Sequence, residues 1–372
     1  MKKLCCIWIA LCLLCGAVGV SASAKEVSAS ARAFVLYCPQ TGDIILSKNK
    51  DERLAMASTT KVMTTLLTLE EADEDDRAVE FTDEMIAEGS SMYLSVGEKV
   101  RLSDLAVGMM MQSGNDAANA AAIAVDGSIE RFCDRMNIKA SELGMKNTHF
   151  VTPSGLDDEE HYSTAFDMAL LLSAAMENER FSEITRNTSM SVSFLSPDDK
   201  TVTYPNHNKL LKLYEPCIGG KTGYTEKAGR CLVSCAQKDG VRLVCVTLDD
   251  PDDWDDHIAL FEEGFSALKA TTLGEQGETF SVPLVGAEND TLTLTYTPQT
   301  AVLSDGEITE RKLILPDFVY APAKKGEALG AIVFFSDGKE IARAALTARE
   351  DAEYIQKEPT FTDFIKGIFK WH

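Results

Sequence analysis

The sequence predicts an α/β (α+β) domain, built from an antiparallel sheet and a helical cluster, followed by a small all-β domain. Residues 33–48 alternate apolar and polar side chains around Pro-Gln-Thr-Gly-Asp, which predicts a β-hairpin. Residues 58–178 favour a block of helices, and residues 218–248 return to strands before a helix over 254–270. From about residue 279 the chain shows only short alternating segments separated by turn residues.

The first 24 residues predict a signal peptide. Two lysines and an apolar core over residues 4–20 precede Ala22-Ser23-Ala24, a small-residue cleavage site, so the mature chain should begin at Lys25. The core has borderline length for an uncleaved anchor, but the cleavage site favours removal. Cys15 follows the bulky Leu14, which disfavours a lipoprotein signal. We therefore expect an exported protein.

The helical block is predicted from apolar periodicity and from capping residues. A helix rich in apolar residues follows Ser58 and runs to about Ala72, and the acidic run after it (70–76) predicts a solvated turn. Ser103 and Ser128 suit N-caps. Further helices are expected over 104–111 and over 128–143. An alanine-rich helix is expected after Asn115 to about Val125, and another from Ser163 or Thr164 to about 178. Residues 191–204 look extended, and strands are expected at 218–225 and in a hairpin over 229–248.

Composition excludes several classes of function. The formal net charge is −22, and loss of the two leader lysines would make it about −24, so nucleic acid is not an expected partner. No C-x-x-C pair occurs after residue 24 and the histidines are scattered, so no metal and no cofactor is expected. Six cysteines remain after the leader. They could form disulfides in an exported protein or serve as small buried hydrophobes.

Ser58 and Lys61 form an S-x-x-K pair at the start of the first helix. Residues three apart share a helix face, so the Lys61 amine can reach the Ser58 hydroxyl. A serine hydroxyl is a poor nucleophile until a nearby base takes its proton. Lysine can do so only if burial or a second cation keeps its amine neutral. The alternative is a capping serine beside a surface lysine.

Two further short motifs follow Ser58 and Lys61 along the chain. Ser113-Gly114-Asn115 breaks the helical block, and Lys221-Thr222-Gly223 lies on a predicted strand. S-x-x-K, S-D-N and K-T-G together are the signature of class A β-lactamases and penicillin-binding proteins, and S-G-N keeps the serine and the asparagine.

With these motifs the chain resembles a low-molecular-mass penicillin-binding protein, a serine-type D-alanyl-D-alanine carboxypeptidase of the D-Ala-D-Ala carboxypeptidase A family. The resemblance extends to TPSGLDDEEHYSTAFDMALL, NHNKLL and IGGKTGYTEKAG and covers nearly everything after the leader. It implies a penicillin-recognising, β-lactamase-like fold, with peptidoglycan stem pentapeptides as substrate. It also implies β-lactam antibiotics as covalent inhibitors, and a place in the cell-wall space at the outer face of the cytoplasmic membrane.

The resemblance also implies roles for single residues. Ser58 would be the nucleophile, Lys61 its base and Ser113 a proton relay. The residues implied to bind substrate are Asn115, Lys221, Thr222, Gly223 and Tyr224, with the backbone amides of Ser58 and Tyr224 forming the oxyanion hole. His207 stands where some relatives have an arginine near the carboxylate pocket, and we expect it, like His161, to be structural.

Three alternatives differ in activity. A class A β-lactamase would need a glutamate in an E-x-x-L-N loop, and no such sequence occurs. The sequence barely distinguishes a D,D-endopeptidase, which cuts cross-links, from a carboxypeptidase. A catalytically silent scaffold would not need all three motifs intact.

The change of pattern predicts a catalytic domain at residues 25–272 and a β-sandwich domain at 277–350. An amphipathic helix is expected over 355–372. One helical face would carry its apolar residues, Phe361, Phe364, Ile365, Ile368 and Phe369, with lysines between them. The segment is too short to span a bilayer but fits a helix lying in the membrane interface. The alternative is a helix docked on the β domain.

Overall fold

The computed structural model describes residues 29–355. The predicted signal peptide and, beyond residue 355, the predicted amphipathic helix lie outside the described residues. Within that range no helix has the length and apolar character needed to cross a membrane.

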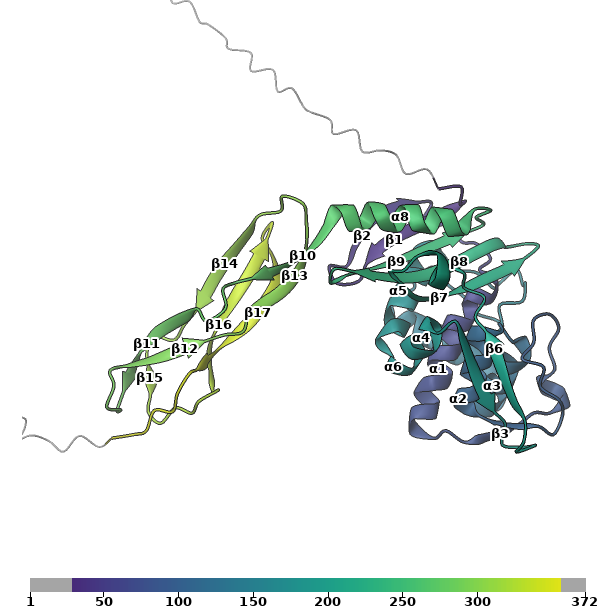
Figure 1. Ribbon diagram of the computed structural model, residues 1–372, viewed down its shortest axis with the longest axis horizontal. Coiled ribbons are helices and arrows are strands. Elements are labelled where there is room, and N and C mark those ends of the chain that lie inside the picture. Colours follow the sequence, from purple (N-terminus) through teal and green to yellow (C-terminus); the bar gives the residue numbers. More distant parts are fainter. Residues whose placement is uncertain (1–28, 356–372) are drawn as a thin grey trace, which may run out of the picture.

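A five-stranded antiparallel sheet forms the centre of the first domain, as predicted (Figure 1). Its strands, in spatial order, are β2 (Asp43–Lys48), β1 (Ala33–Cys38), β9 (Val241–Leu248), β8 (Gly229–Lys238) and β7 (Cys217–Thr225). The strands β8 and β9 are buried along most of their length, because helices cover both faces of the sheet. The strand β7, which carries the K-T-G motif, lies at the edge of the sheet and leaves one side of its backbone without a neighbouring strand.

Two hydrophobic cores lie on the two faces of this sheet. On one face Val35, Val233 and Val244 pack with the helical cluster, and on the other Leu36 and Leu232 pack with α8. The helices of the cluster are α1 (Lys61–Glu74), α2 (Leu102–Met111), α3 (Asn115–Asp126), α4 (Ile129–Glu142), α5 (Ala165–Glu177) and α6 (Glu179–Arg186). The opposite face is covered by α8 (Asp253–Ala267). The predicted α/β (α+β) domain, with an antiparallel sheet and a helical cluster, is therefore confirmed.

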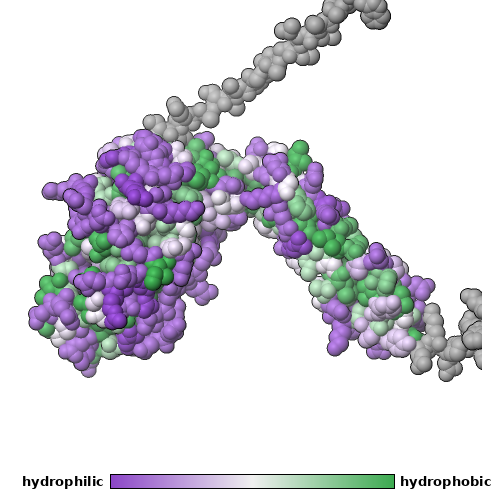
Figure 2. Space-filling model, turned by 180° about the vertical axis from the view of Figure 1, so that it is seen from behind, coloured by the Kyte–Doolittle hydropathy of each residue, from purple (hydrophilic) through white to green (hydrophobic). Residues whose placement is uncertain are grey.

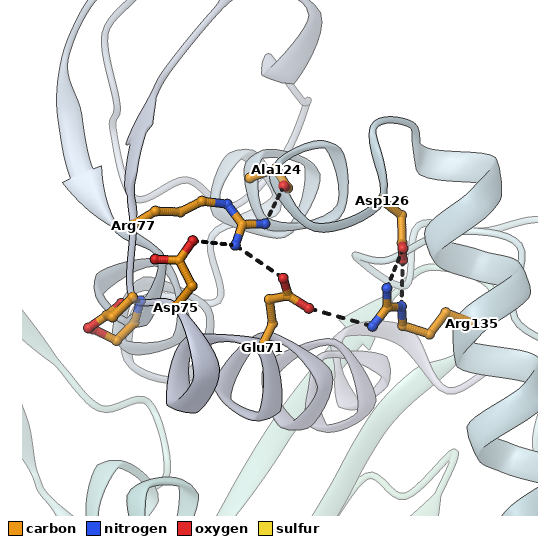
Figure 3. Close-up of polar contacts among 8 residues, drawn as sticks. Glu71, Asp75, Arg77, Ala124, Asp126 and Arg135 are labelled. Atoms are coloured by element: carbon orange, nitrogen blue, oxygen red, sulfur yellow. Dashed lines mark hydrogen bonds and ion pairs between the residues drawn. The ribbon is translucent and has the colours of Figure 1, made fainter.

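The C-terminal end of α1 is held by a network of charged side chains (Figure 3). Arg77 donates to Glu71 at 3.1 Å and to the carbonyl oxygen of Ala124 at 2.8 Å. Arg135 binds Asp126 at 2.5 Å, and another of its nitrogens lies 3.7 Å from Glu71. Each such partly exposed pair stabilises a fold by about 1 kcal/mol or less. Together they join the helix that begins at Lys61 to α3 and α4.

The second part of the chain is entirely β-structure, as predicted. A six-stranded sheet has the order β14-β16-β17-β12-β11-β15, and a separate pair is formed by β10 and β13. The bounds are β10 (Leu268–Leu273), β11 (Thr279–Val285), β12 (Thr291–Thr295), β13 (Gln299–Ser304), β14 (Thr309–Ile314), β15 (Val319–Tyr320), β16 (Ala328–Ser336) and β17 (Lys339–Ala348). The core between them contains Leu273, Leu294, Leu303, Ile332 and Leu346. We call this part the β domain.

Several local predictions need correction. The helix expected over 254–270 ends at Ala267, and the next residues form β10, which pairs with β13 across the expected domain boundary. The helix α6 was not predicted, nor was the small strand pair β3 (Ala78–Glu80) with β4 (Lys99–Arg101). The extended stretch expected over 191–204 corresponds to β5 (Ser189–Ser193) paired with β6 (Thr201–Pro205). A short helix, α7 (Leu210–Leu213), precedes β7. The six cysteines of residues 29–355 are buried and unpaired, as small hydrophobes would be.

Candidate active site

Ser58 lies in a single 3₁₀ turn (Ala57–Thr60) that leads directly into α1. Ala57 has φ of +47°, a left-handed conformation that is costly for a residue with a side chain. Two glycines make room around this turn. A Cβ on Gly155 would lie 2.0 Å from the carbonyl oxygen of Ala57, and one on Gly223 would lie 3.0 Å from the Ser58 nitrogen. The turn is therefore enclosed between a loop and the edge strand β7.

The Lys61 amine lies 3.0 Å from the Ser58 hydroxyl oxygen and is fully buried. It also donates to the side-chain oxygen of Asn115 and to the carbonyl oxygen of Ser154, both at 2.6 Å. A neutral amine has two N–H groups and one lone pair. The two carbonyl oxygens can take both N–H groups, which leaves the lone pair for the proton of the Ser58 hydroxyl. The surroundings thus suit an uncharged lysine that accepts a proton from serine.

The environment of Lys61 favours this uncharged form. Burial holds the pKa of Lys61 well below its ordinary value, and the positive charge of Lys221 lowers it further. Asp116 acts in the opposite direction and more weakly. Burial also lowers the pKa of Lys221 to about 7. Lys221 on β7 therefore lies close enough to Lys61 on α1 to influence its protonation.

Ser113 lies in the loop between α2 and α3, as predicted, whereas Asn115 is the first residue of α3. Ser113 has φ of +59°, and its hydroxyl oxygen accepts from the Lys221 amine at 3.1 Å. The Asn115 side-chain nitrogen donates to the carbonyl oxygen of Glu88 at 2.6 Å, which fixes the amide so that its oxygen faces Lys61. The three motifs, far apart in sequence, thus form one connected set of polar groups.

A cleft of about 510 Å³ opens above these groups. Its lining includes Ser58, Ser113, Thr222, Gly223 and Tyr224, while Lys61, Asn115 and Lys221 are buried beneath it. The side chain of Tyr224 is 66% exposed, which suits a contribution through its backbone. Because β7 is an edge strand, an extended peptide can pair with it and bring a carbonyl carbon to Ser58.

The loop over residues 150–163 contributes contacts that the sequence did not reveal. Ser154 presents its carbonyl oxygen to Lys61, and Thr64 donates to the carbonyl oxygen of Pro153 at 2.6 Å. His161 accepts from the Val151 N–H through Nδ1, so its Nε2 carries the proton and donates to Thr60 at 2.8 Å. Burial lowers the pKa of His161 to about 4, which keeps it neutral. Its position is structural, as expected.

Arg230 was also missed, although it lines the cleft together with His207, Asp253 and Trp254. It forms an ion pair with Asp253, and its guanidinium carbon lies 5.6 Å from the centre of the Trp254 ring. Its buried Nε has no hydrogen-bond partner among residues 29–355. An arginine in an alternating strand carries no functional signal of its own, since only the pairing of β8 with β7 brings it opposite Tyr224. No group of three or more His, Cys, Asp or Glu side chains within residues 29–355 is arranged to hold a metal ion.

Comparison with known proteins gives consistent matches. The family model described as D-alanyl-D-alanine carboxypeptidase matches residues 19–252. The D-alanyl-D-alanine carboxypeptidase DacF of Bacillus subtilis (strain 168) is 32% identical over 358 residues, covering 92% of this chain and 90% of its own length. DacC of Escherichia coli (strain K12) is 32% identical over 355 residues, covering 88% and 85%. Penicillin binding protein 5 from Haemophilus influenzae superposes with a TM-score of 0.65 at 27% identity, covering 88% of this chain and 98% of its own. The matches to DacF, DacC and penicillin binding protein 5 each cover at least 88% of this chain, so they extend beyond the first domain into the β domain.

Proposed function

This chain belongs to the D-alanyl-D-alanine carboxypeptidase family, a family of serine hydrolases that bind penicillin, and we propose that Ser58 carries out its reaction. The observation that carries this assignment is the contact between Ser58 and a buried Lys61 whose two N–H groups have other acceptors. The substrate is a peptidoglycan stem peptide that ends in D-Ala-D-Ala.

In the proposed reaction the Ser58 oxygen attacks the carbonyl carbon of the penultimate D-alanine. The hydroxyl proton passes to Lys61, and the Ser58 oxygen forms an ester with the peptide. The bond to the terminal D-alanine breaks, and the proton held by Lys61 is relayed through Ser113 and Lys221, which lie 3.1 Å apart, to the leaving amine, so that Lys61 is neutral again. In the second step Lys61 takes a proton from water as the water oxygen attacks the ester carbonyl, and this proton passes to the Ser58 oxygen when the ester bond breaks. The same attack on a β-lactam ring gives the stable penicillin adduct.

The backbone amides of Ser58 and Tyr224 are proposed to bind the developing oxyanion. The close approach of Gly223 to the Ser58 nitrogen supports this, since a Cβ at residue 223 would lie only 3.0 Å away. Each well-placed donor of this kind contributes about 3 kcal/mol to transition-state stabilisation. Asn115 is proposed to orient Lys61, and its amide also suits the substrate backbone.

The terminal carboxylate of the substrate needs cationic and hydroxyl partners at the far end of the cleft. Thr222 supplies a hydroxyl, Lys221 a positive charge from below, and Arg230 is the guanidinium that lines the cleft. Its pairing with Asp253 and its stacking on Trp254 hold it in place. We therefore add Arg230 to the proposed substrate-binding residues.

Replacing Arg230 by glutamine should raise KM for a D-Ala-D-Ala peptide about tenfold, because it removes one charge-assisted hydrogen bond. Steady-state D-alanine release measures this, with Arg343→Gln in the β domain as the matched control. A peptide whose C-terminus is amidated lacks the carboxylate, so it should be cleaved equally poorly by the wild-type protein and the variant. An unchanged KM for the free-acid peptide would remove Arg230 from the site.

The activity itself is tested with the purified mature protein and a pentapeptide ending in D-Ala-D-Ala. We expect release of one D-alanine per peptide and a covalent adduct with labelled penicillin on a denaturing gel. Rapid release of hydrolysed penicillin would instead indicate a β-lactamase. Cleavage of cross-linked dimers in preference to pentapeptides would indicate a D,D-endopeptidase, and the absence of any adduct would indicate a silent scaffold.

The location is proposed from the sequence of the two ends. The leader 1–24 would direct export, and the apolar face from Phe361 to Phe369 would hold the mature enzyme at the outer face of the cytoplasmic membrane. The peptidoglycan substrate requires a place outside the cytoplasm, which supports this proposal.

Removing residues 359–372 should release the mature enzyme from washed membranes without loss of soluble activity, because the deleted segment contains the apolar face, whereas the cleft-lining residues of the described part of the chain lie between Ser58 and Trp254. Centrifugation of membranes followed by D-alanine release assays of both fractions provides the measurement. A truncated enzyme that still pellets with washed membranes would contradict the proposed anchor.

A further inference from the structure

The β domain exposes several large apolar side chains at one end. We define the distal patch as Val285, Leu315, Phe318, Tyr320, Tyr354 and Ile355. Tyr320 is 67% exposed and Tyr354 is 61% exposed. In Figure 2 hydrophobic residues run along the β domain toward the end where the chain passes into its C-terminal residues. Exposed apolar groups that gather in this way mark an interaction surface.

Residues of the distal patch come from three segments that meet in space. Val285 on β11 pairs with Tyr320 on β15, and the rings of Phe318 and Tyr320 lie 5.1 Å apart, edge to face. The Ile355 N–H donates to the carbonyl oxygen of Gly286 at 2.8 Å. A Cβ on Gly286 would lie 3.2 Å from the ring of Tyr354. Figure 1 places β15 and the last described residues at the end of the β domain away from α8.

The chemistry of the distal patch is apolar and aromatic rather than basic. Lys324 and Lys325 lie nearby, since Ala323 pairs with Ala352, but Asp351 accepts from the Lys325 backbone and other acids flank the patch. Tyrosine and phenylalanine rings are the groups that favour the boundary between lipid headgroups and acyl chains. The affinity of this patch for a membrane would therefore come from burial of these rings and would change little with salt concentration.

The chain itself restricts how far this end of the β domain can lie from an anchored C-terminus. Ile355 belongs to the distal patch, and the apolar face of the C-terminal segment begins at Phe361. Six residue steps span at most about 21 Å. If residues 361–369 lie in the membrane interface, the distal patch is held within that distance of the bilayer.

We propose that the distal patch is a second membrane contact, which lies against the lipid headgroups beside the C-terminal segment. This rests on the proposed anchoring of the enzyme at the membrane. A single weak anchor binds reversibly, and stable attachment takes two signals. The distal patch is the second signal, because it increases the membrane affinity that the C-terminal segment provides. Without that segment, the patch is too weak to hold the enzyme on washed membranes.

The test uses the full mature chain and sedimentation with vesicles of phosphatidylcholine and phosphatidylglycerol in equal parts. The double variant Phe318→Ser, Tyr320→Ser should bind about tenfold more weakly than the wild type, with little change when salt is raised. Ile308→Ser is the matched control. Ile308 is 80% exposed in the same domain, but it precedes β14 at the end opposite Ile314 and should not affect binding. Tyr354→Ser provides an independent variant, and thermal unfolding checks that each protein is folded.

Other occupants of the patch predict different results. If residues 361–369 fold back onto it, the double variant should bind vesicles as well as or better than the wild type and expose the C-terminus to protease in the absence of lipid. If a second copy covers it, the wild type should be dimeric without vesicles and the variant monomeric. Either result overturns the proposal. Failure of the wild type to bind vesicles at all would overturn the anchor as well, whereas D-alanine release by every variant reports the enzymatic proposal separately.

Discussion

Replacing Ser58 by alanine should abolish both covalent penicillin labelling and D-alanine release while the protein remains folded. The variant has no oxygen that can form the ester, so the covalent route is closed, and loss of a nucleophile typically costs a factor of about 10⁴ or more in turnover. Only one atom is deleted, and the Lys61 amine keeps its contacts to Asn115 and Ser154. Gel labelling, D-alanine release and thermal unfolding are the three measurements.

Ser90 offers the matched control, because it also lines the cleft and its alanine variant makes the same chemical change. Its carbonyl oxygen accepts from the Asn115 backbone, a contact that a side-chain substitution leaves intact. We expect Ser90→Ala to keep its penicillin adduct. An adduct on the Ser58→Ala protein would show that another residue is acylated.

Lys61→Arg should lose acylation almost as completely as Ser58→Ala. Arginine is a cation of similar reach, but a guanidinium does not give up its proton in proteins and so cannot act as a base. Lys221→Arg should keep part of the rate, because at that position positive charge matters more than proton exchange. In the wild type, burial and Lys221 depress the pKa of Lys61, so the neutral base persists to lower pH than it would in an ordinary lysine and is lost as the pH falls through that depressed value.

Rates of penicillin acylation measured across pH decide between these roles. The wild type should show an acidic limb from protonation of Lys61, and the Lys221→Arg variant should retain that limb at a reduced rate. Thermal unfolding of Lys61→Arg is the necessary check, since position 61 is fully buried. If a folded Lys61→Arg protein acylates at near the wild-type rate, Lys61 acts only through its charge, and the base must be sought at Ser113 or Lys221.

Local sequence patterns predicted those parts of the site that depend on local geometry. The i, i+3 spacing of Ser58 and Lys61 corresponds to a contact of 3.0 Å, although Ser58 lies in a 3₁₀ turn and the α-helix begins only at Lys61. A 3₁₀ turn also brings residues i and i+3 together, so the predicted contact between the two side chains forms although the helix type differs. The strands of the β domain were predicted because alternation and turn residues are local signals as well.

The parts that could not be predicted depend on tertiary contacts. Lys61 donates to a backbone carbonyl at Ser154, and a carbonyl has no signature in a sequence, since every residue has one. Arg230 reaches the cleft only because β8 pairs with β7 in a particular register. The strand β10 was assigned to the preceding helix because Leu268 and Ala270 continue its apolar pattern, and only pairing with β13 favours the extended form.

The single shared hydroxyl of Ser58 also limits the routes to antibiotic resistance. Penicillin and the cell-wall peptide are proposed to meet the same serine, the same neutral amine and the same two amides. A substitution among those groups that slows the drug therefore slows trimming of the wall by the same step. A resistant variant has to change groups that the two ligands contact differently. The exposed side chain of Tyr224 at the cleft is one place for such a difference, whereas the buried Lys61, Asn115 and Lys221 beneath the cleft serve both ligands in the proposed reaction.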